Sequence, residues 1–408
     1  MHIRVSLSAE TPLTFRDGRD AARATTLNYI PGSTLLGGLA ESYLRNSNSK
    51  IAFDDWFLRG KIRFSNLYPA KFAVETLQDS AIPVRPLPLT ASSCKRFSGF
   101  HFGTKAENEH RHGVTDILIP LFLFTLSGEH AIDILEPFSE CPTCQAPLER
   151  FAGFFRRGQN LAEIGVAAKS QALRTRTGIN YATGATMQGI LYSRAVLPKG
   201  ANFWGEWHVA DAAASDFQMF VEEAVDAGSV RIGNNRTRGM GRITMNLSEC
   251  EAEDTELLQK RIEAFNRLLH FDAARFAIPT PAALYVPLTL TSDAILYDRL
   301  LRPQLQITDD YLRSVWGLAG AQVIYQVAGV RRIESWNTVW GLPKADDLAI
   351  AMGSVFLIAL PTNDPDTFQR LYTLQEQGIG ARRIEGFGAV RVADAFHIEH
   401  LQASGGYR

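Results

Sequence analysis

The chain has 408 residues, 46% of them hydrophobic and 21% charged, and a formal net charge of -1. This length is too great for one compact core, so we expect two or three domains, and the near-zero charge points to no particular class of partner. The sequence has no signal-peptide core, no apolar run of membrane-spanning length and only four cysteines, which favours a cytoplasmic protein without a disulfide framework.

The first residues predict a strand followed by a helix with a tight start. His2–Ala9 alternates between apolar and polar side chains, as a half-buried strand does. After a polar loop, a helix opens near Gly32, and Ser33 or Thr34 can cap it. Such a glycine-lined helix N-terminus can also bind an anion, which makes Ser33 a candidate contact. Ile62–Leu67 predicts a second strand.

An insertion at about residues 89–157 carries the pattern of a zinc site. It contains one Cys-x-x-Cys turn, and a tetrahedral zinc ion needs two further ligands, which one more thiolate and one imidazole can supply. The predicted ligands are Cys94, His112, Cys141 and Cys144. His110 is a credible substitute for His112. A redox motif is one alternative, although we find no strand–helix unit around the cysteines, and buried free thiols are another. A catalytic zinc is disfavoured because no glutamate stands beside a histidine in a deaminase or protease pattern.

A basic segment follows the insertion. Residues 150–199 contain eight basic side chains and one acidic side chain. In a neutral protein, this is typical of a groove for an anion, most often a nucleic acid, although a solvated loop is the alternative. The candidate contacts in the basic loop at residues 158–190 are Lys169, Arg174 and Arg176. The loop leads into two predicted strands, Gly189–Leu197 and Phe203–Val209.

Residues 229–247 predict a helix exit, a loop rich in arginine and glycine, and a strand. Before them, apolar residues recur at helical spacing from Phe217 to Val225, with Ser215 as the expected N-cap and Gly228 as the helix stop. The loop contains no acidic residue, and arginine forks and free backbone N–H groups suit phosphate oxygens. The candidate contacts are Arg231, Arg236, Arg238, Gly239 and Gly241.

The same order of elements recurs near the C-terminus. Thr362–Gln377 predicts an amphipathic helix that Gly378 can end, and a loop and a short strand follow. The candidate contacts in this second loop are Arg382, Arg383, Gly386 and Gly388. Either copy alone could be a surface turn with solvated arginines. Two copies of the same order indicate an internal duplication.

These elements divide the chain into an N-terminal domain at residues 1–250, a helical linker at 251–282 and a C-terminal domain at 283–408. In the C-terminal domain, Tyr285–Thr291 predicts the first strand. Thr308 can cap a helix that runs to about Trp316, and the apolar run Gly353–Ile358 predicts a buried strand.

Several motifs together resemble the RAMP superfamily of CRISPR-associated proteins. The first is IPGSTLLG at residues 30–37, and the second is a Gly-x₅-Gly-x-Gly loop before a last strand. The order of the Ser-Cys-Lys triplet at 93–95, the Cys-x-x-Cys turn, GLPK at 341–344 and GSV at 353–355 is similar to the two-domain RAMP subunit of type III complexes. Subtype III-D is the most similar.

The resemblance implies an α+β fold with two ferredoxin-like, RRM-type βαββαβ domains, the first of which would contain the zinc-knuckle insertion. It also implies a non-catalytic scaffold of an antiviral effector ribonucleoprotein, which grips the five-prime handle of the guide RNA. The implied partners are this CRISPR RNA, the large polymerase-like subunit and the backbone RAMP subunits, with target RNA contacted indirectly and no membrane.

The strands carry no RRM-type aromatic motif, so we expect RNA along the glycine loops and residues 169–176 rather than across a sheet. A sequence-neutral grip on a phosphate chain needs arginine, lysine and backbone donors on loops. Tyr181, Tyr192 and Phe387 can stack on bases or fill the core.

Two other functions compete with the scaffold. A metal-independent endoribonuclease that processes CRISPR precursor RNA would need a general base and a general acid. Its candidates are His2, Tyr29, His101 and His110, which nothing in the sequence groups together. A small-molecule zinc enzyme is weaker still, because the sequence shows no assembled acid–base pair.

Overall fold

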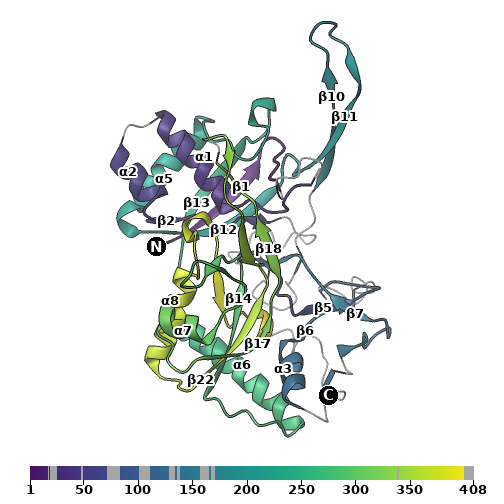
Figure 1. Ribbon diagram of the computed structural model, residues 1–408, viewed down its shortest axis with the longest axis vertical. Coiled ribbons are helices and arrows are strands. Elements are labelled where there is room, and N and C mark those ends of the chain that lie inside the picture. Colours follow the sequence, from purple (N-terminus) through teal and green to yellow (C-terminus); the bar gives the residue numbers. More distant parts are fainter. Residues whose placement is uncertain are drawn as a thin grey trace.

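The computed structural model is a mixed α/β structure with two four-stranded antiparallel cores, a projecting two-stranded ribbon and several smaller sheets (Figure 1). The structure describes residues 1–16, 18, 25–46, 49–70, 83–100, 111–127, 134–135, 138–156, 165–166, 171–337 and 340–398. None of the helices within these ranges is both long enough and apolar enough to cross a bilayer.

The N-terminal sheet is built from strands that are far apart in the sequence. Its order is β13 (Ile243–Cys250), β1 (His2–Ala9), β12 (Asn202–Val209) and β2 (Ile62–Arg63), with the short β3 (Tyr68–Pro69) also on β12. All neighbours run antiparallel. Because side chains alternate along β1, Ile3, Val5 and Leu7 all face the core. The helices that cover this face are α1 (Gly32–Asn46), α2 (Lys50–Phe57) and α5 (Asp211–Asp226).

The C-terminal sheet repeats this order. Its strands are β17 (Gln322–Val327), β22 (Val355–Leu360), β14 (Leu284–Leu290) and β23 (Val390–Val392). In both sheets, the first strand of the unit lies between the third and the fourth, and the second strand lies at the edge beside the third. Before the second strand, the N-terminal unit has two helices and the C-terminal unit has one, and in each unit one α-helix precedes the fourth strand. In the C-terminal unit, these helices are α7 (Asp309–Trp316) and α8 (Pro365–Gln377).

The C-terminal sheet is buried on both faces, which explains why β14 and β22 are buried along their whole length and mostly apolar. On one face, Val286 and Phe356 pack with residues of α7 and α8. On the other face, Tyr285 and Leu357 pack against α3 (Leu118–Leu126) and α6 (Thr255–Arg275).

The insertion supplies α3 and therefore packs on the C-terminal sheet, although it interrupts the chain of the N-terminal unit (Figure 1). Its two small sheets are β6 (Val114–Asp116), β5 (Ala91–Cys94) and β7 (Leu148–Arg150), and β4 (Arg85–Pro86), β8 (Phe154–Arg156) and β9 (Gly165–Val166). The Leu89 N–H donates to the Gly353 carbonyl at 2.7 Å. A fully buried relay adds to this contact: Asp116 Oδ2 lies 2.7 Å from His397 Nδ1, and His397 Nε2 lies 2.7 Å from Thr289 Oγ1.

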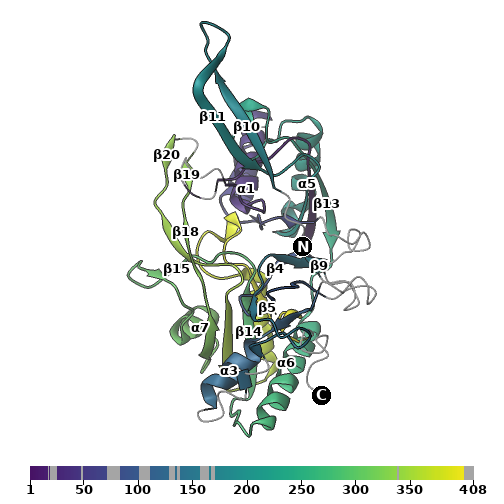
Figure 2. The same cartoon turned by 90° about the vertical axis from the view of Figure 1, so that its right-hand side faces the viewer.

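A long ribbon projects from the N-terminal unit (Figures 1 and 2). It consists of β10 (Ala172–Ile179) and β11 (Thr186–Val196), which pair with each other only. The remaining short pairs are β15 (Leu296–Tyr297) with β16 (Pro303–Gln304), β18 (Val330–Ile333) with β21 (Asp347–Ile350), and β19 (Trp336–Asn337) with β20 (Leu342–Pro343).

Several predicted boundaries are confirmed. The strand His2–Ala9 is present, and the Thr308 side chain caps a helix that ends at Trp316. The Ser215 cap is wrong: α5 begins at Asp211, because the three alanines before Ser215 favour helix and the Asp211 carboxylate suits its positive end. The predicted caps of α1 are also wrong, since this helix begins at Gly32 and Ser33 lies inside its first turn.

The buried relay generates a stability prediction. Asp116→Ala should lower the free energy of unfolding by about 1–3 kcal/mol, because it leaves the buried His397 nitrogen without its acceptor. Urea unfolding followed by fluorescence measures the change. Asp310→Ala is the matched control: Asp310 lies at the exposed start of α7, so its loss should change stability by about 0.5 kcal/mol or less. Equal effects of the two substitutions would contradict the relay's role.

Candidate functional site

The two arginine- and glycine-rich loops have the same backbone conformation. In the first, which we call loop 1 (residues 229–242), a left-handed Asn235 precedes the 3₁₀ turn Arg236–Arg238, and a left-handed Gly239 follows it. In loop 2 (residues 378–389), a left-handed Arg382 precedes the 3₁₀ turn Arg383–Glu385, and a left-handed Gly386 follows it. The second glycine of each Gly-x-Gly is also equivalent. A β-carbon on Gly241 would lie 2.5 Å from the Ile232 carbonyl oxygen, and one on Gly388 would lie 1.8 Å from that of Ile379.

Hydrogen bonds repeat this equivalence. The Ile232 N–H donates to the Gly241 carbonyl at 3.0 Å, and the Ile379 N–H donates to the Gly388 carbonyl at 2.7 Å. The predicted duplication therefore extends from the strand order of the sheets to the individual turns of the loops.

Loop 1 is joined to the middle of the ribbon, where Arg176 pairs with Tyr192. Arg176 on β10 donates from Nη2 to the Arg238 carbonyl at 3.3 Å, and Arg238 donates from Nη1 to the hydroxyl of Tyr192 on β11 at 3.0 Å. The structure thus brings two separately predicted sets of basic residues together. Tyr192 therefore lies at the contact between the ribbon and loop 1. Tyr181 is fully exposed near the tip of the ribbon.

The positive charge of this surface is not balanced within the described part of the chain. Arg174 lies directly opposite Arg194 across the ribbon, and like charges in such a pair repel each other. No carboxylate among the described residues lies within ion-pairing distance of the arginines in this surface, which are Arg174, Arg176, Arg194, Arg231 and Arg238. Arg236 differs, since it forms an ion pair with Glu41 of α1. The arrangement can bind an extended polyanion, because each guanidinium keeps free donors.

The arginines of loop 2 are used within the protein. Arg382 forms ion pairs with Asp347 at 2.8 Å and Glu385 at 2.6 Å, and its guanidinium lies 4.8 Å from the ring centre of Phe387. Arg383 is exposed and donates to the Gln377 carbonyl at 3.3 Å. The two loops therefore differ at single arginines: Arg238 of loop 1 has no carboxylate partner among the described residues, whereas Arg382 of loop 2 has two.

Loop 2 also packs against the N-terminal unit. The Phe64 N–H donates to the Ile384 carbonyl at 3.1 Å, and a β-carbon on Gly386 would lie 2.5 Å from the Phe64 carbonyl oxygen. The N-terminus of α1 meets the same place, where the Gly32 N–H donates to Asn66 Oδ1 at 3.0 Å. Ser33 is half-buried one residue further along, and Lys169 lies outside the described residues.

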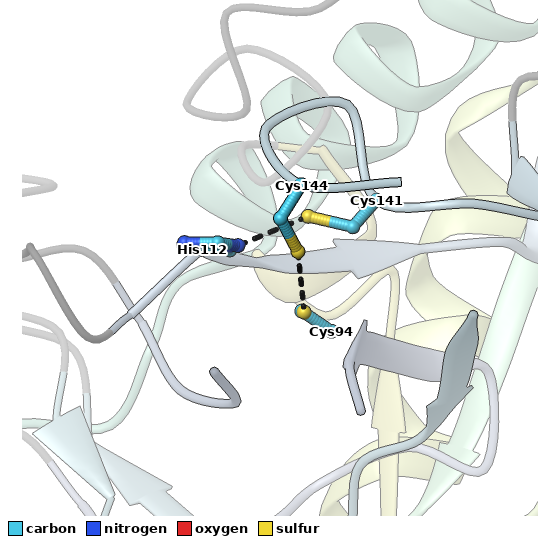
Figure 3. Close-up of side chains that lie close together, drawn as sticks. All are labelled: Cys94, His112, Cys141 and Cys144. Carbon is cyan, nitrogen blue, oxygen red and sulfur yellow. Dashed lines mark hydrogen bonds between the residues drawn. The ribbon is translucent and has the colours of Figure 1, made fainter. Parts of the chain in front are cut away.

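The four predicted zinc ligands come together (Figure 3). Their ligand atoms all lie within 4.8 Å of one another. Cys94 Sγ lies 3.5 Å from Cys144 Sγ, and His112 Nδ1 lies 3.2 Å from Cys141 Sγ. Bonds of about 2.3 Å from zinc to sulfur and 2.0–2.1 Å from zinc to nitrogen would fit such a tetrahedron. The cluster could therefore hold a metal ion, and the competing ligand His110 lies outside the described residues.

Local structure favours the thiolate form of one of these cysteines, Cys94. Burial acts to raise the pKa of the Cys94 thiol, but hydrogen bonds from the backbone N–H groups of Phe97 and Arg96 and from the Cys144 and Cys141 side chains together leave this pKa below its usual value. The Phe97 N–H points to Cys94 Sγ at 3.4 Å, and the Phe97 ring lies 4.8 Å from the ring of His112.

The nuclease candidates have separate surroundings. His2 Nε2 lies 2.7 Å from Glu376 Oε2, and its ring stacks on His208. Burial, followed by the charge of Arg63, lowers the pKa of His208 to about 4. The hydroxyl of the buried Tyr29 instead accepts from Arg331 Nη1 at 3.0 Å. His101 and His110 lie outside the described residues.

The sequence analysis missed two exposed aromatic residues and one arginine. Trp336 and Trp340 are 55% and 75% exposed at the β19–β20 hairpin, where large apolar side chains in a polar stretch could have indicated a binding surface. Arg194 was counted as a basic residue but not selected. The structure places Arg194 in the arginine surface, directly opposite Arg174 across the ribbon.

Comparisons with known proteins identify the family. The model of the RAMP superfamily matches residues 6–244, and no curated protein matches the chain. Among solved structures, the type III-B Cmr-beta complex bound to cognate target RNA and AMPPnP contains a chain that is 15% identical. That match covers 87% of this chain and 86% of the other, with a TM-score of 0.39. A match at 13% identity, with the same coverage and a TM-score of 0.37, comes from Cmr-beta bound to cognate target RNA. The apo state gives 10% identity over 61% of this chain and 98% of the other, with a TM-score of 0.28.

The family match spans more than half of the chain and includes the last residues of β1, then α1, the ribbon, loop 1 and the first residues of β13. The chain belongs to the RAMP superfamily of CRISPR-associated proteins.

Proposed function

We propose that this protein is an RNA-binding scaffold subunit of a type III CRISPR effector ribonucleoprotein, of a III-D-like subtype, and that it grips the five-prime handle of the guide RNA. The observation that carries the proposal is the uncompensated arginine surface where the ribbon meets loop 1. RNA phosphates are the ligand class that satisfies several guanidinium groups along one line.

The chemistry of this surface favours binding over cleavage. Residues 172–196 and 229–242 contain no histidine and no carboxylate, so they offer no general acid–base pair for RNA hydrolysis. They do offer donors and a phenol ring, Tyr192, that can stack on a base. The surface therefore suits a subunit that holds RNA without altering it.

The proposed architecture is a pair of ferredoxin-like units, one for each sheet. Their shared strand order and helix positions support this interpretation. The other proposed partners are the large polymerase-like subunit and the backbone RAMP subunits, with target RNA contacted through the guide. We also propose that the Cys₃His cluster holds a structural zinc ion, because its four donors match the zinc ligand set and lie on a small sheet and a turn that have little other core.

The RNA proposal predicts the effect of two substitutions. Arg176→Ala combined with Arg238→Ala should weaken binding of a labelled CRISPR-repeat RNA. It should also reduce the slope of log affinity against log salt by about 1.4, because each single-strand phosphate that the protein no longer neutralises lowers the slope by about 0.7. Filter binding at several salt concentrations measures both quantities.

Arg299→Ala combined with Arg313→Ala is the matched control, since it removes the same charge from exposed positions beside α7. The control should leave the slope unchanged. If the two double variants had the same slope, the RNA would have to bind elsewhere.

The zinc proposal predicts a loss of stability without a loss of RNA binding. Cys141→Ser combined with Cys144→Ser should lower the melting temperature and remove the sulfur-to-metal charge-transfer band of the cobalt-substituted protein. Cys250→Ser should keep that band, because Cys250 lies on β13 outside the cluster. Freshly purified protein that lacks both zinc and the cobalt band would refute the site.

A metal-independent endoribonuclease is the alternative function, and one observation favours it: His2 is paired with a carboxylate at 2.7 Å. The scaffold proposal predicts that repeat RNA stays intact in EDTA. The nuclease alternative predicts cleavage at one phosphodiester and its loss on changing His2, Tyr29 and Lys169 together to alanine. Gel analysis of the labelled RNA separates the two outcomes.

A further inference from the structure

We propose that His2, His208 and Glu376 form a second metal site, for a divalent transition ion of the zinc class, at the junction of the two sheet units. Two strands of the N-terminal unit supply the imidazoles, and the last turn of α8 in the C-terminal unit supplies the carboxylate. The site is separate from the four-ligand cluster in the insertion.

The strand register creates the imidazole pair. His2 on β1 is the direct partner of His208 on β12. The neighbouring pair, Ile3 and Trp207, points into the core, so both histidines point to the opposite face of the sheet. On that face, α8 brings Glu376 to within 2.7 Å of His2 Nε2.

The distances fit one shared ion. One ligand atom from each of the three side chains lies within 4.8 Å of the others. The imidazole ring centres are 5.2 Å apart, and two imidazoles bound to one tetrahedral zinc at about 2.0–2.1 Å have ring centres roughly 5 Å apart. Three protein ligands also leave a fourth position for water or an exogenous ligand. The side chains of His2 and Glu376 are 20% and 18% exposed, which gives an ion a route into the site.

Two neighbouring positive charges, on Arg63 and on the N-terminal amine of Met1, oppose the ion, and Arg63 supplies a sensitive test. Arg63 on β2 is the register partner of His208, and it acts electrostatically on both His208 and Glu376. A divalent cation in the site must overcome this repulsion. Arg63→Gln should therefore bind zinc several-fold more tightly, whereas a metal-free hydrogen-bonded junction predicts no change in metal affinity.

The deciding measurement is the number of metal ions per chain in protein without a polyhistidine tag, dialysed against zinc. We expect two equivalents in the wild type. One equivalent should remain after His208→Ala or Glu376→Gln, and one after Cys141→Ser combined with Cys144→Ser. His270→Ala is the matched control, because this exposed histidine of α6 lies outside both clusters. Cobalt spectra assign the equivalents, since only the cysteine cluster gives the sulfur charge-transfer band.

Glu376→Gln keeps a hydrogen-bonding partner for His2 and removes only the anionic ligand, so a folded variant remains available if His208→Ala does not fold. Loss of one equivalent in this variant, with unchanged cobalt–sulfur absorption, supports the site. A wild type in which the cysteine cluster accounts for all of the bound zinc, or a Glu376→Gln variant that keeps as much zinc as the wild type, overturns it. RNA affinity of Glu376→Gln should equal that of the wild type, so failure of this proposal and failure of the RNA proposal are distinguishable.

Discussion

The arrangement of the two units depends on a place where three stretches of backbone approach more closely than a β-carbon allows. A β-carbon on Gly32 would lie 1.8 Å from the Phe64 carbonyl oxygen, and one on Gly386 would lie 2.5 Å from the same atom. The backbone at residues 64–66 therefore lies between the start of α1 and loop 2. A hydrogen bond from the Phe64 N–H to the Ile384 carbonyl stabilises this arrangement. Only glycine permits this joint.

The joint explains why two loops of the same conformation have different charge environments. Loop 2 is enclosed by the other unit, where an unpaired guanidinium would be costly, and Arg382 accordingly has two carboxylate partners. Loop 1 lies beside the projecting ribbon, and water can solvate its arginines until a ligand replaces it. The same loop conformation thus contributes to cohesion of the protein in loop 2 and, under the proposed function, to RNA binding in loop 1.

The sequence predicted those features that local rules determine. The Cys-x-x-Cys spacing identified the four-residue cluster that could hold a metal ion, and the glycine positions identified the two loops, because left-handed turns and thiolate ligands restrict residue type strongly. The Ser215 cap was wrong because a short run of alanines extended the helix past a plausible start. Contacts between residues far apart in the sequence could not be predicted from it. Nothing local connects His2 with Glu376, which are 374 positions apart, or shows that loop 2 faces Phe64.

The relay between Asp116 and His397 has a consequence for the order of synthesis. Its two members are 281 residues apart, so at about 5–20 residues per second the ribosome needs roughly 15–60 s to supply the second one. Until α6 and β14 have been synthesised, the apolar face of α3 has neither of them to cover it. The insertion is thus translated early, but its packing partners are synthesised later. We therefore expect a chaperone to bind the nascent chain at residues 118–126.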